Sequence, residues 1–498
     1  LDITYWTSVP IPNDLAVHLI SLYLETDHPL LGTFDPHLFV ADLISNNEKY
    51  CSCLMVTAIL YLSCQSSMSD EERPGHLLSE LARESRDNWL RERDTDSWTV
   101  LGATFVLCMA DIANGKNGIV LEYFNNAMHM GQRLGLFGIE IRVRQGDIAD
   151  PEALRVASCC AWGTFTWIVL ASFLYQQPRL ECPRLPPALP IPGEKSSSQH
   201  KPSGRSHYMA IFPILCQFAS IILDLSLRYH QAGRVVDQVQ PCQQFAEFKY
   251  RELLAWAETL PPWMTNGQAN ASPHTIIFHI WYHSIILDIF RPFIQNPTAI
   301  TSSSNPPPPS FHPPNNHLLR TFSAPDSTPS AVFSASVDQL KYLIVTYRSH
   351  YAPSSHSILW HTGLLYLANA MLSDHGSDHT PGGHTQNQNQ NERHTYFLIC
   401  IYGYATLRRR FLLANIMVRA LLSMALRRGR MPSAEARRIL AMLGGDGGGG
   451  ADDDDTPTST LHAAFVGDSA LAMRDLDAAS VENMASQFSD AAILQEFT

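Results

Sequence analysis

The amino-acid sequence predicts an all-α protein, and three observations carry this prediction. Apolar residues recur at helical spacing, as at Tyr123, Ala127, Met130 and Leu134. Runs in which apolar and polar residues strictly alternate between hairpin turn signals are scarce. Apolar residues make up 45% of the 498 residues, which is enough for a substantial core. We therefore expect a large helical body.

The expected helices follow one another along the chain. Apolar faces lie at Leu15–Tyr23, then at Tyr123–Phe137, and later at Leu340–Tyr347. The stretches 51–68 and 275–287 carry no charge but contain Ser, Thr, His or Gln among the apolar residues. This composition is typical of core helices in a large soluble bundle.

The most informative expected helix begins at Asp150, Pro151 and Glu152, which supply a polar cap, a first-turn proline and an acid. No charged residue follows between Arg155 and Arg179. Such a helix must be buried. Its uncharged 23 residues are long enough to span a membrane, but Ser, Thr, Cys and Gln recur within them. We therefore expect a core helix and no membrane contact.

Composition divides the chain into four parts. Residues 1–300 form the expected regulatory domain, and residues 301–330, with eight prolines, form a linker that cannot be helical. Residues 331–443 form a C-terminal helical part with a polar, disordered insertion at 374–394. Residues 444–498 begin with a Gly-rich break and continue as an acidic, disordered tail.

The net charge of −12 belongs almost wholly to this tail. From Asp446 onward eleven Asp and Glu oppose one Arg, so the tail carries −10 and the body is nearly neutral. The body therefore shows no basic face that would hold nucleic acid on its own. Acidic and apolar residues alternate in the tail, which is typical of an activation segment. The candidate activation residues are Asp452, Asp453, Asp454, Asp455, Leu461, Phe465, Leu471, Leu476, Phe488 and Phe497. A plain acidic tail is the alternative.

The segment Leu407–Arg438 carries nine arginines and no lysine, with Glu435 as its only acid. We expect a basic amphipathic contact helix here, with candidate contacts at Arg408, Arg409, Arg410, Arg419, Arg427, Arg428 and Arg430. A solvated helix face, the protein's own acidic tail, and a nucleic acid or other acidic partner remain open as its environment.

Motifs for catalysis and metal binding are absent from the sequence, including H-E-x-x-H, G-x-x-x-x-G-K-[ST], G-x-S-x-G and C-x₂-C. The ten cysteines lie mostly in apolar runs, which suits an intracellular protein with reduced thiols. His279 and His283 share a helix face among apolar residues and fit core histidines better than metal ligands. We expect no catalytic, metal or cofactor site. An all-α metal-dependent lyase or hydrolase, using these histidines or Asp452–Asp455, is the alternative.

Several local motifs occur in a fixed order over about 280 residues. They are Leu15–Phe39, Leu54–Cys64, Ala127–Leu136, Trp162–Phe165 followed by Pro183–Pro192, Leu254–Pro261, and His279–Phe293 ending in Arg-Pro-Phe. In this order they resemble the middle homology region of fungal zinc-cluster transcription factors. The opening Tyr5–Pro12 and the N-terminal third look closest to members that regulate nitrogen assimilation. The buried helix departs from the family pattern, because only Arg155 precedes its aromatic residues and no charge lies within it.

The resemblance implies a nuclear regulatory domain rather than an enzyme. It implies a helical module behind a DNA-binding zinc cluster, which would lie upstream of Leu1, so no zinc or DNA residue can be assigned in this chain. It further implies homodimers, coactivator partners and a small-molecule or protein effector. From the near-neutral body beside a −10 tail, we expect the body to restrain the tail until a signal releases it.

Overall fold

A computed structural model describes residues 1–67, 76–137, 150–174, 180–194, 210–229, 242–265, 271–295, 328–351, 357–373, 383–408, 410–444, 466–472 and 475–488. Throughout these ranges the regular structure is helical, and an isolated antiparallel bridge pairs Val466 with Ser480. The all-α prediction is confirmed.

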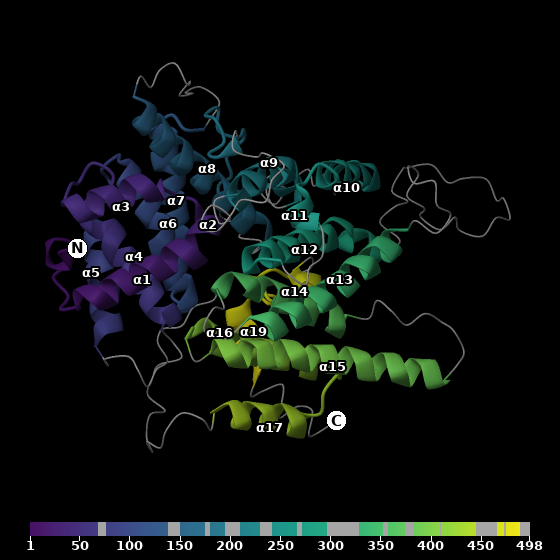
Figure 1. The fold of residues 1–498 in the computed structure, drawn as a ribbon. Helices are drawn as coiled ribbons and strands as arrows, with labels where there is room; N and C mark the ends of the chain where they lie inside the picture. Colours follow the sequence, from purple (N-terminus) through teal and green to yellow (C-terminus); the bar gives the residue numbers. More distant parts are fainter. Residues whose placement is uncertain are drawn as a thin grey trace.

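The first half of the chain forms a bundle around two apolar helices (Figure 1). Its elements are η1 (Ile3–Tyr5), α1 (Asn13–Thr26), α2 (His28–Leu31), α3 (Pro36–Ser45), α4 (Cys53–Ser67), α5 (Leu77–Glu92), α6 (Trp98–Ala113) and α7 (Asn117–Arg133). The central pair is α4 and α6; α1 and α5 cover α4, and α7 covers α6. All but two residues of α6 are buried, as its mean hydropathy requires.

Helix α8 (Pro151–Leu174) is the expected buried helix, and it joins the two halves of the protein. It packs against α6 and α7 on one side and against α9 (Ile211–Tyr229) and α12 (Pro273–Gln295) on the other. Both α8 and α9 are long and apolar enough to cross a membrane, but the apolar window of α8 is wholly buried within the protein and that of α9 is 67% buried. The prediction of a core helix at α8 is confirmed.

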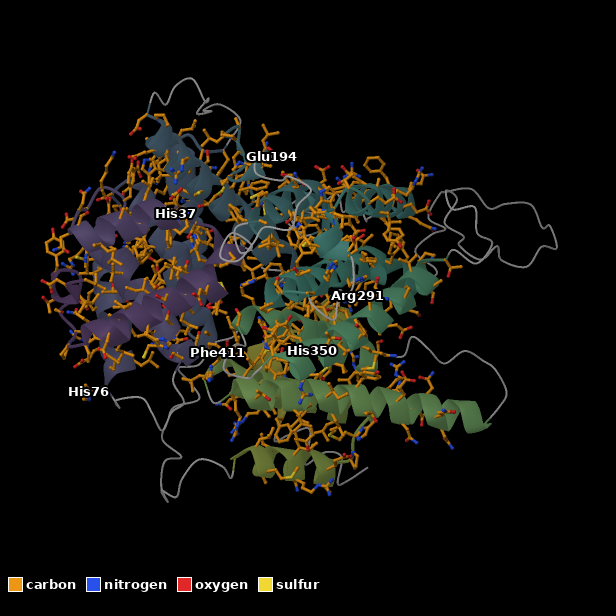
Figure 2. The ribbon with its side chains drawn as sticks, in the orientation of Figure 1. His37, His76, Glu194, Arg291, His350 and Phe411 are labelled. Atoms are coloured by element: carbon orange, nitrogen blue, oxygen red, sulfur yellow. The ribbon has the colours of Figure 1, made fainter. Side chains whose placement is uncertain are left out.

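The second half is built on α12 and α13 (Pro329–His350), which pack along each other. Around them lie α10 (Gln243–Ala257), α11 (Pro262–Thr265), η8 (Ile358–Trp360), α14 (His361–Leu372), α15 (Gly383–Leu407), α16 (Leu413–Arg427) and α17 (Ser433–Gly444). Two short helices, α18 (Ser469–Ala472) and α19 (Val481–Ser486), come last. Figure 2 labels Arg291 of α12, which is 6% exposed and pairs with Asp288 at 2.9 Å.

A short segment between α2 and α3 passes through the interior of this structure. Gly32 ends α2 with a φ of +58°, and Thr33 then runs between α6 and α8. A Cβ on Gly163 of α8 would lie 2.8 Å from Thr33 Cα, and one on Gly102 of α6 would lie 2.9 Å from the Thr33 carbonyl oxygen. Glycine is therefore required on both helices for the backbones to approach this closely.

Residues just before this segment connect it to the second half of the chain. The Ser357 hydroxyl donates a hydrogen bond to Asp27 at 2.6 Å, and His274 Nε2 lies 2.8 Å from the carbonyl oxygen of Thr26. Burial raises the pKa of Asp27, and burial lowers the pKa of His28 to about 3. The N-terminal bundle and the second half are thus joined by buried polar contacts as well as by α8.

Helix α15 begins at Gly383, inside the segment 374–394 that we expected to be disordered. Residues 374–382 lie outside the described part of the chain. The polar composition misled the prediction, because this end of α15 is held by polar contacts. Arg393 donates to the carbonyl oxygens of Met371 and Ser373, and Lys341 of α13 reaches Glu392 at 2.9 Å. The domain boundaries stay predictions.

Candidate regulatory site formed by the C-terminal tail

The arginine-rich segment does not form the single amphipathic helix that we expected. The segment is shared by the end of α15, by α16 and by α17, and residues 408, 410–412 and 428–432 lie outside these helices. Gly429 has a φ of +61° and lies directly after α16, and Pro432 precedes α17. A left-handed glycine and a nearby proline are common stop signals for a helix. The arginines therefore lie mainly at helix ends and connections.

The candidate arginines have different surroundings. Arg410 donates to the carbonyl oxygen of Ser66 at the end of α4, beside buried Phe411, which Figure 2 labels where the first half meets α15 and α16. Arg427 donates to the Gln487 side chain at 3.1 Å, and Arg428 donates to both oxygens of Asp468 at 2.7 Å. Arg408 is half-buried, Arg419 and Arg430 are exposed, and Arg409 lies outside the described residues.

The described part of the tail, residues 466–472 and 475–488, is folded against the body, contrary to the expected disorder. Helix α19 packs on α16 and is drawn in yellow in Figure 1. Val481, Met484 and Phe488 are 0%, 1% and 7% exposed. Their spacing puts them on one helix face, and their burial offsets the cost of ordering so short a segment.

The candidate activation residues are divided by this packing. Phe488 is buried, whereas Leu471 and Leu476 are half-buried. Asp452, Asp453, Asp454, Asp455, Leu461, Phe465 and Phe497 lie outside the described residues. The structure therefore brings Phe488 to α16 and does not place the aspartate run.

Helix α16 needs a cover because it is apolar on nearly every side. Its buried residues include Met417, Leu421 and Met424, while Asn415, Arg419 and Arg427 are its exposed positions. Helices α14 and α15 cover part of it, and α17 packs nearby. Without the tail, the face under α19 would be open to water, at a cost of about 25 cal/mol for each Å² of apolar surface.

Three consecutive tail residues, Gly467, Asp468 and Ser469, make polar contacts with Asn369 and Arg428. Asn369 of α14 donates to the carbonyl oxygen of Gly467 at 2.7 Å, and its own oxygen accepts from the Ser469 amide at 3.2 Å. Asp468 pairs with Arg428 and also caps α18 by accepting from the Ala470 and Leu471 amides. Both groups of the Asn369 amide are thus used on tail backbone.

The tail segment is closed on itself where it meets the body. The amides of Gly467 and Asp468 both donate to the carbonyl oxygen of Ala479, at 2.8 and 3.2 Å. A Cβ on Gly467 would lie 2.3 Å from Met484 Cε and 2.8 Å from Val481 Cγ2. A larger residue at this position would therefore displace the Met484 and Val481 side chains where the beginning of the segment crosses α19.

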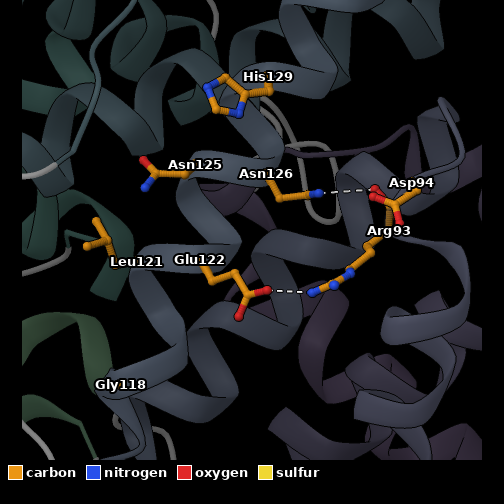
Figure 3. A pocket seen from close by; sticks show the side chains of 8 residues that line it. All are labelled: Arg93, Asp94, Gly118, Leu121, Glu122, Asn125, Asn126 and His129. Atoms are coloured by element: carbon orange, nitrogen blue, oxygen red, sulfur yellow. Dashed lines mark hydrogen bonds and ion pairs between the residues drawn. The ribbon is translucent and has the colours of Figure 1, made fainter.

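A separate surface pocket of about 490 Å³ lies between the end of α5 and α7 (Figure 3). Its lining is mostly polar and consists of Arg93, Asp94, Gly118, Leu121, Glu122, Asn125, Asn126 and His129. Arg93 pairs with Glu122, and Asn126 donates to the Arg93 carbonyl oxygen at 3.1 Å. The charges of Arg93 and Glu122 are thus paired, whereas the buried Oδ1 atoms of Asn125 and Asn126 have no hydrogen-bond partner in the described part of the chain.

The histidines considered as metal ligands bond to protein groups. His279 Nε2 lies 2.9 Å from the Met264 carbonyl oxygen, and His283 Nδ1 lies 3.4 Å from the Ser336 hydroxyl. Burial lowers the pKa of both, to about 3 for His283. Among the described residues, no group of three or more His, Cys, Asp or Glu is placed to hold a metal ion.

Comparison with known proteins decides the class of the chain. Residues 20–259 match the family model described as the fungal specific transcription factor domain. This chain carries a fungal specific transcription factor domain. The matched segment runs from α1 through α10. It therefore includes Gly32–Thr33, the segment that passes between α6 and α8, which we call the buried crossing. The family is a transcription factor family and not one of enzymes.

Two curated relatives are distant homologues of the chain. It is 24% identical over 327 residues to the nitrogen assimilation transcription factor nit-4 of Neurospora crassa, covering 59% of this chain and 29% of that protein. It is 23% identical over 321 residues to the nitrogen assimilation transcription factor nirA of Emericella nidulans, covering 59% and 35%. The chain thus spans about a third of the length of these relatives. No solved structure matches it significantly.

The motifs that suggested the fungal transcription factor domain have clear structural roles. Trp162 of α8 donates to the Leu189 carbonyl oxygen at 2.9 Å and so holds the Pro-rich stretch on this helix. Trp256 of α10 donates to Gln217 of α9 at 3.1 Å and stacks on Phe218. These contacts position helices and do no chemistry.

The contacts of Gly467–Ser469 with Asn369 and Arg428, which we call the tail site, lie beyond the matched domain. Sequence analysis named Arg428 and did not name Asn369. Asn369 was not a candidate because nothing in its apolar surroundings marks it. The one local signal was Asp468-Ser469, an acid directly before a short helix, which is a capping pattern.

Proposed function

We propose that this chain is the regulatory part of a sequence-specific fungal transcription factor. The observation that carries the proposal is the domain match over residues 20–259, supported by similarity to two nitrogen assimilation transcription factors. A zinc cluster encoded upstream of Leu1 would bind DNA, and the protein would act in the nucleus, as a homodimer, on genes of nitrogen assimilation. Its effector would bind the helical body.

The acidic tail is the proposed activation segment. Its net charge of −10 and its alternation of acids with Leu, Met and Phe supply solubility together with short apolar anchors for a coactivator groove. Phe488 is buried on the body, so a coactivator can reach it only after this part of the tail has moved. The packing of the tail on α16 therefore supports restraint by the body.

A DNA-tethered reporter tests the activation segment. Residues 1–498 are fused to an unrelated DNA-binding domain, with and without Gly447–Thr498, and we expect the deletion to abolish reporter activity. Because the deletion also uncovers α16, a milder variant combines Asp452→Asn, Asp453→Asn, Asp454→Asn and Asp455→Asn. The matched control replaces the acids Asp70, Glu71 and Glu72 by their amides. Unchanged activity in both tail variants, at equal protein levels, would refute the activation role.

The missing DNA-binding part has its own test. The 5′ end of the native transcript is read through to its initiator codon, and we expect a C-x₂-C-x₆-C half followed by a second half. A message that starts at or near Leu1 would remove the zinc cluster from the proposal. Chromatin immunoprecipitation of the native protein at nitrate- and ammonium-responsive promoters then tests the nitrogen role.

A further inference from the structure

We infer that the surface formed by α14 and α16 is a peptide-binding site, and that residues 466–488 of this chain are its detachable ligand. The inference deepens the proposed function by supplying the contact that would be regulated. It is tested on purified protein without DNA or a reporter, so it can fail while the proposed function stands, and the reverse also holds.

The contacts have the pattern of peptide recognition by a preformed surface. Asn369 binds tail backbone through both of its amide groups, which recognises a main chain whatever its side chains. Arg428 then selects an acid at the next position, because its Nη2 donates charge-assisted hydrogen bonds to both oxygens of the Asp468 carboxylate. Asp468 and Arg428 expose 8% and 23% of their side chains, so water screens this pair only partly.

Apolar anchors complete the recognition on α16. Val481 and Met484 of α19 are buried together with Phe488, two residues after its end, in the manner of a short amphipathic segment laid on an apolar surface. The opposite face is polar, with Asn483, Ser486 and Gln487 exposed. The expected ligand is therefore an acidic segment with Gly-Asp-Ser followed by a helical turn that carries Val, Met and Phe.

The segment is built as a ligand rather than as a core helix. Its helices α18 and α19 have four and six residues, too few to be stable alone, so the segment orders on contact with the body. By contrast, α14 and α16 have twelve and fifteen residues and are packed by α12, α13 and α15 as well. Twenty-one residues of Gly- and Asp-rich sequence separate α17 from Val466, so covalent attachment does not force the contact.

The test uses the full chain with a specific protease site inserted between Gly448 and Gly449 and a fluorophore at the C-terminus. After cleavage, we expect the labelled fragment to remain with the body at micromolar concentration and to separate on dilution. Circular dichroism of the body should stay helical. An excess of unlabelled synthetic peptide 466–488 should displace the fragment, as followed by fluorescence anisotropy.

Matched variants show whether the recognised groups are those in the structure. Arg428→Gln should weaken binding of the peptide by about tenfold or more, because it removes a charge-assisted bidentate contact. Arg419→Gln, at an exposed position of α16, is the control and should leave binding unchanged. In the peptide, Asp468→Asn should weaken binding in the same way, and Asp477→Asn should not.

Four results would count against the inference. If the body loses helix as the fragment leaves, or if excess peptide never displaces the fragment, residues 466–488 are an integral part of the fold. If the fragment leaves at every concentration and the peptide does not bind, α14 and α16 form no binding site. Equal effects of Arg428→Gln and Arg419→Gln would reject the assigned contacts.

Discussion

Arg155 of α8 donates two hydrogen bonds to one carboxylate oxygen of Asp35, at 3.1 Å from Nε and 2.6 Å from Nη2. The other carboxylate oxygen caps α3 by accepting from the amides of His37 and Leu38, both at 3.0 Å. One buried acid thus starts a helix and fixes that helix to the centre of the fungal transcription factor domain. Arg155 is also the charge that precedes the long uncharged stretch in the sequence.

Replacing these two residues separates the two roles of the acid. Asp35→Ala should destabilise the protein by about 2 kcal/mol or more, because the cap and the ion pair are both lost. Arg155→Ala should cost under about 1 kcal/mol, since half of its side chain is exposed. Urea unfolding followed by circular dichroism gives both values, and an equal cost for the two would contradict the capping role. Asp14→Ala, in the exposed first turn of α1, is the control.

The glycines beside Thr33 should not tolerate a methyl group. Gly163→Ala and Gly102→Ala would each bring a Cβ within 3 Å of backbone atoms, so helix α6 or α8 must shift, and we expect a loss of about 1–3 kcal/mol or more. Gly118→Ala, in the exposed first turn of α7, should instead be neutral or stabilising by about 0.5 kcal/mol. Thermal unfolding of the three variants compares them. A stable Gly163→Ala would show that the crossing has spare room.

Gly467→Ala should loosen the tail without disturbing the body. The new Cβ would collide with Met484 and Val481, which are two of the apolar anchors on α16. Hydrogen exchange should therefore become fast at the amides of Gly467, Asp468 and Met484, while α4 and α6 remain protected. Ala478→Gly, in the same tail segment but outside these contacts, serves as the comparison. Slow exchange in Gly467→Ala would mean that the segment adapts in place.

Acid should destabilise the protein below about pH 6.5 through its buried histidines. Burial lowers the pKa of His28 to about 3 and that of His361 to about 4, whereas an unfolded chain protonates histidine near 6.5. The unfolded state then binds more protons, so stability present above pH 6.5 is lost as the pH falls, by about 1.4 kcal/mol per pH unit for each such histidine. Between pH 6.5 and 5, His28→Phe should reduce the slope of the unfolding free energy against pH by the contribution of one proton, about 1.4 kcal/mol per pH unit.

Asp27 and His18 also matter for measuring the pH dependence of unfolding. Asp27 acts in the opposite direction, because burial raises its pKa. Just above the ordinary carboxyl pKa, the folded state binds the Asp27 proton more than the unfolded chain does, so this group adds stability as the pH falls. His18→Gln, at an exposed position of α1, serves as the matched histidine replacement. An unaltered slope in His28→Phe would show that His28 does not titrate as its burial requires.

Sequence patterns predicted what depends on local composition. Helix α8 was predictable because an uncharged stretch of 23 residues has few alternatives to burial. The start of α15 was not, because Gln and Asn are uninformative and the helix is held by Arg393 and Glu392 through partners far along the chain. The arginine-rich segment was misread because Gly429 and Pro432 were given less weight than the charge pattern.

The tail site shows the same limit more sharply. Its charge and apolar residues were visible in the sequence, and these suggested both an activation segment and contact with the arginines. The contact itself joins Asn369 to Gly467 across 98 residues and depends on the shape of α14. No periodicity in either segment encodes that pairing.

The buried crossing at Gly32–Thr33 also orders events during synthesis. This segment is enclosed by α6 and α8 and covered by the ring of Phe212, which would lie 2.1 Å from a Cβ on Gly32. At 5–20 residues per second, Phe212 leaves the ribosome roughly 10–40 s after Gly32. During that interval Leu30, Leu31 and Phe34 have no complete apolar surroundings, although each is at most 3% exposed in the finished protein. The nascent chain is therefore a natural client for a chaperone that binds short apolar peptides.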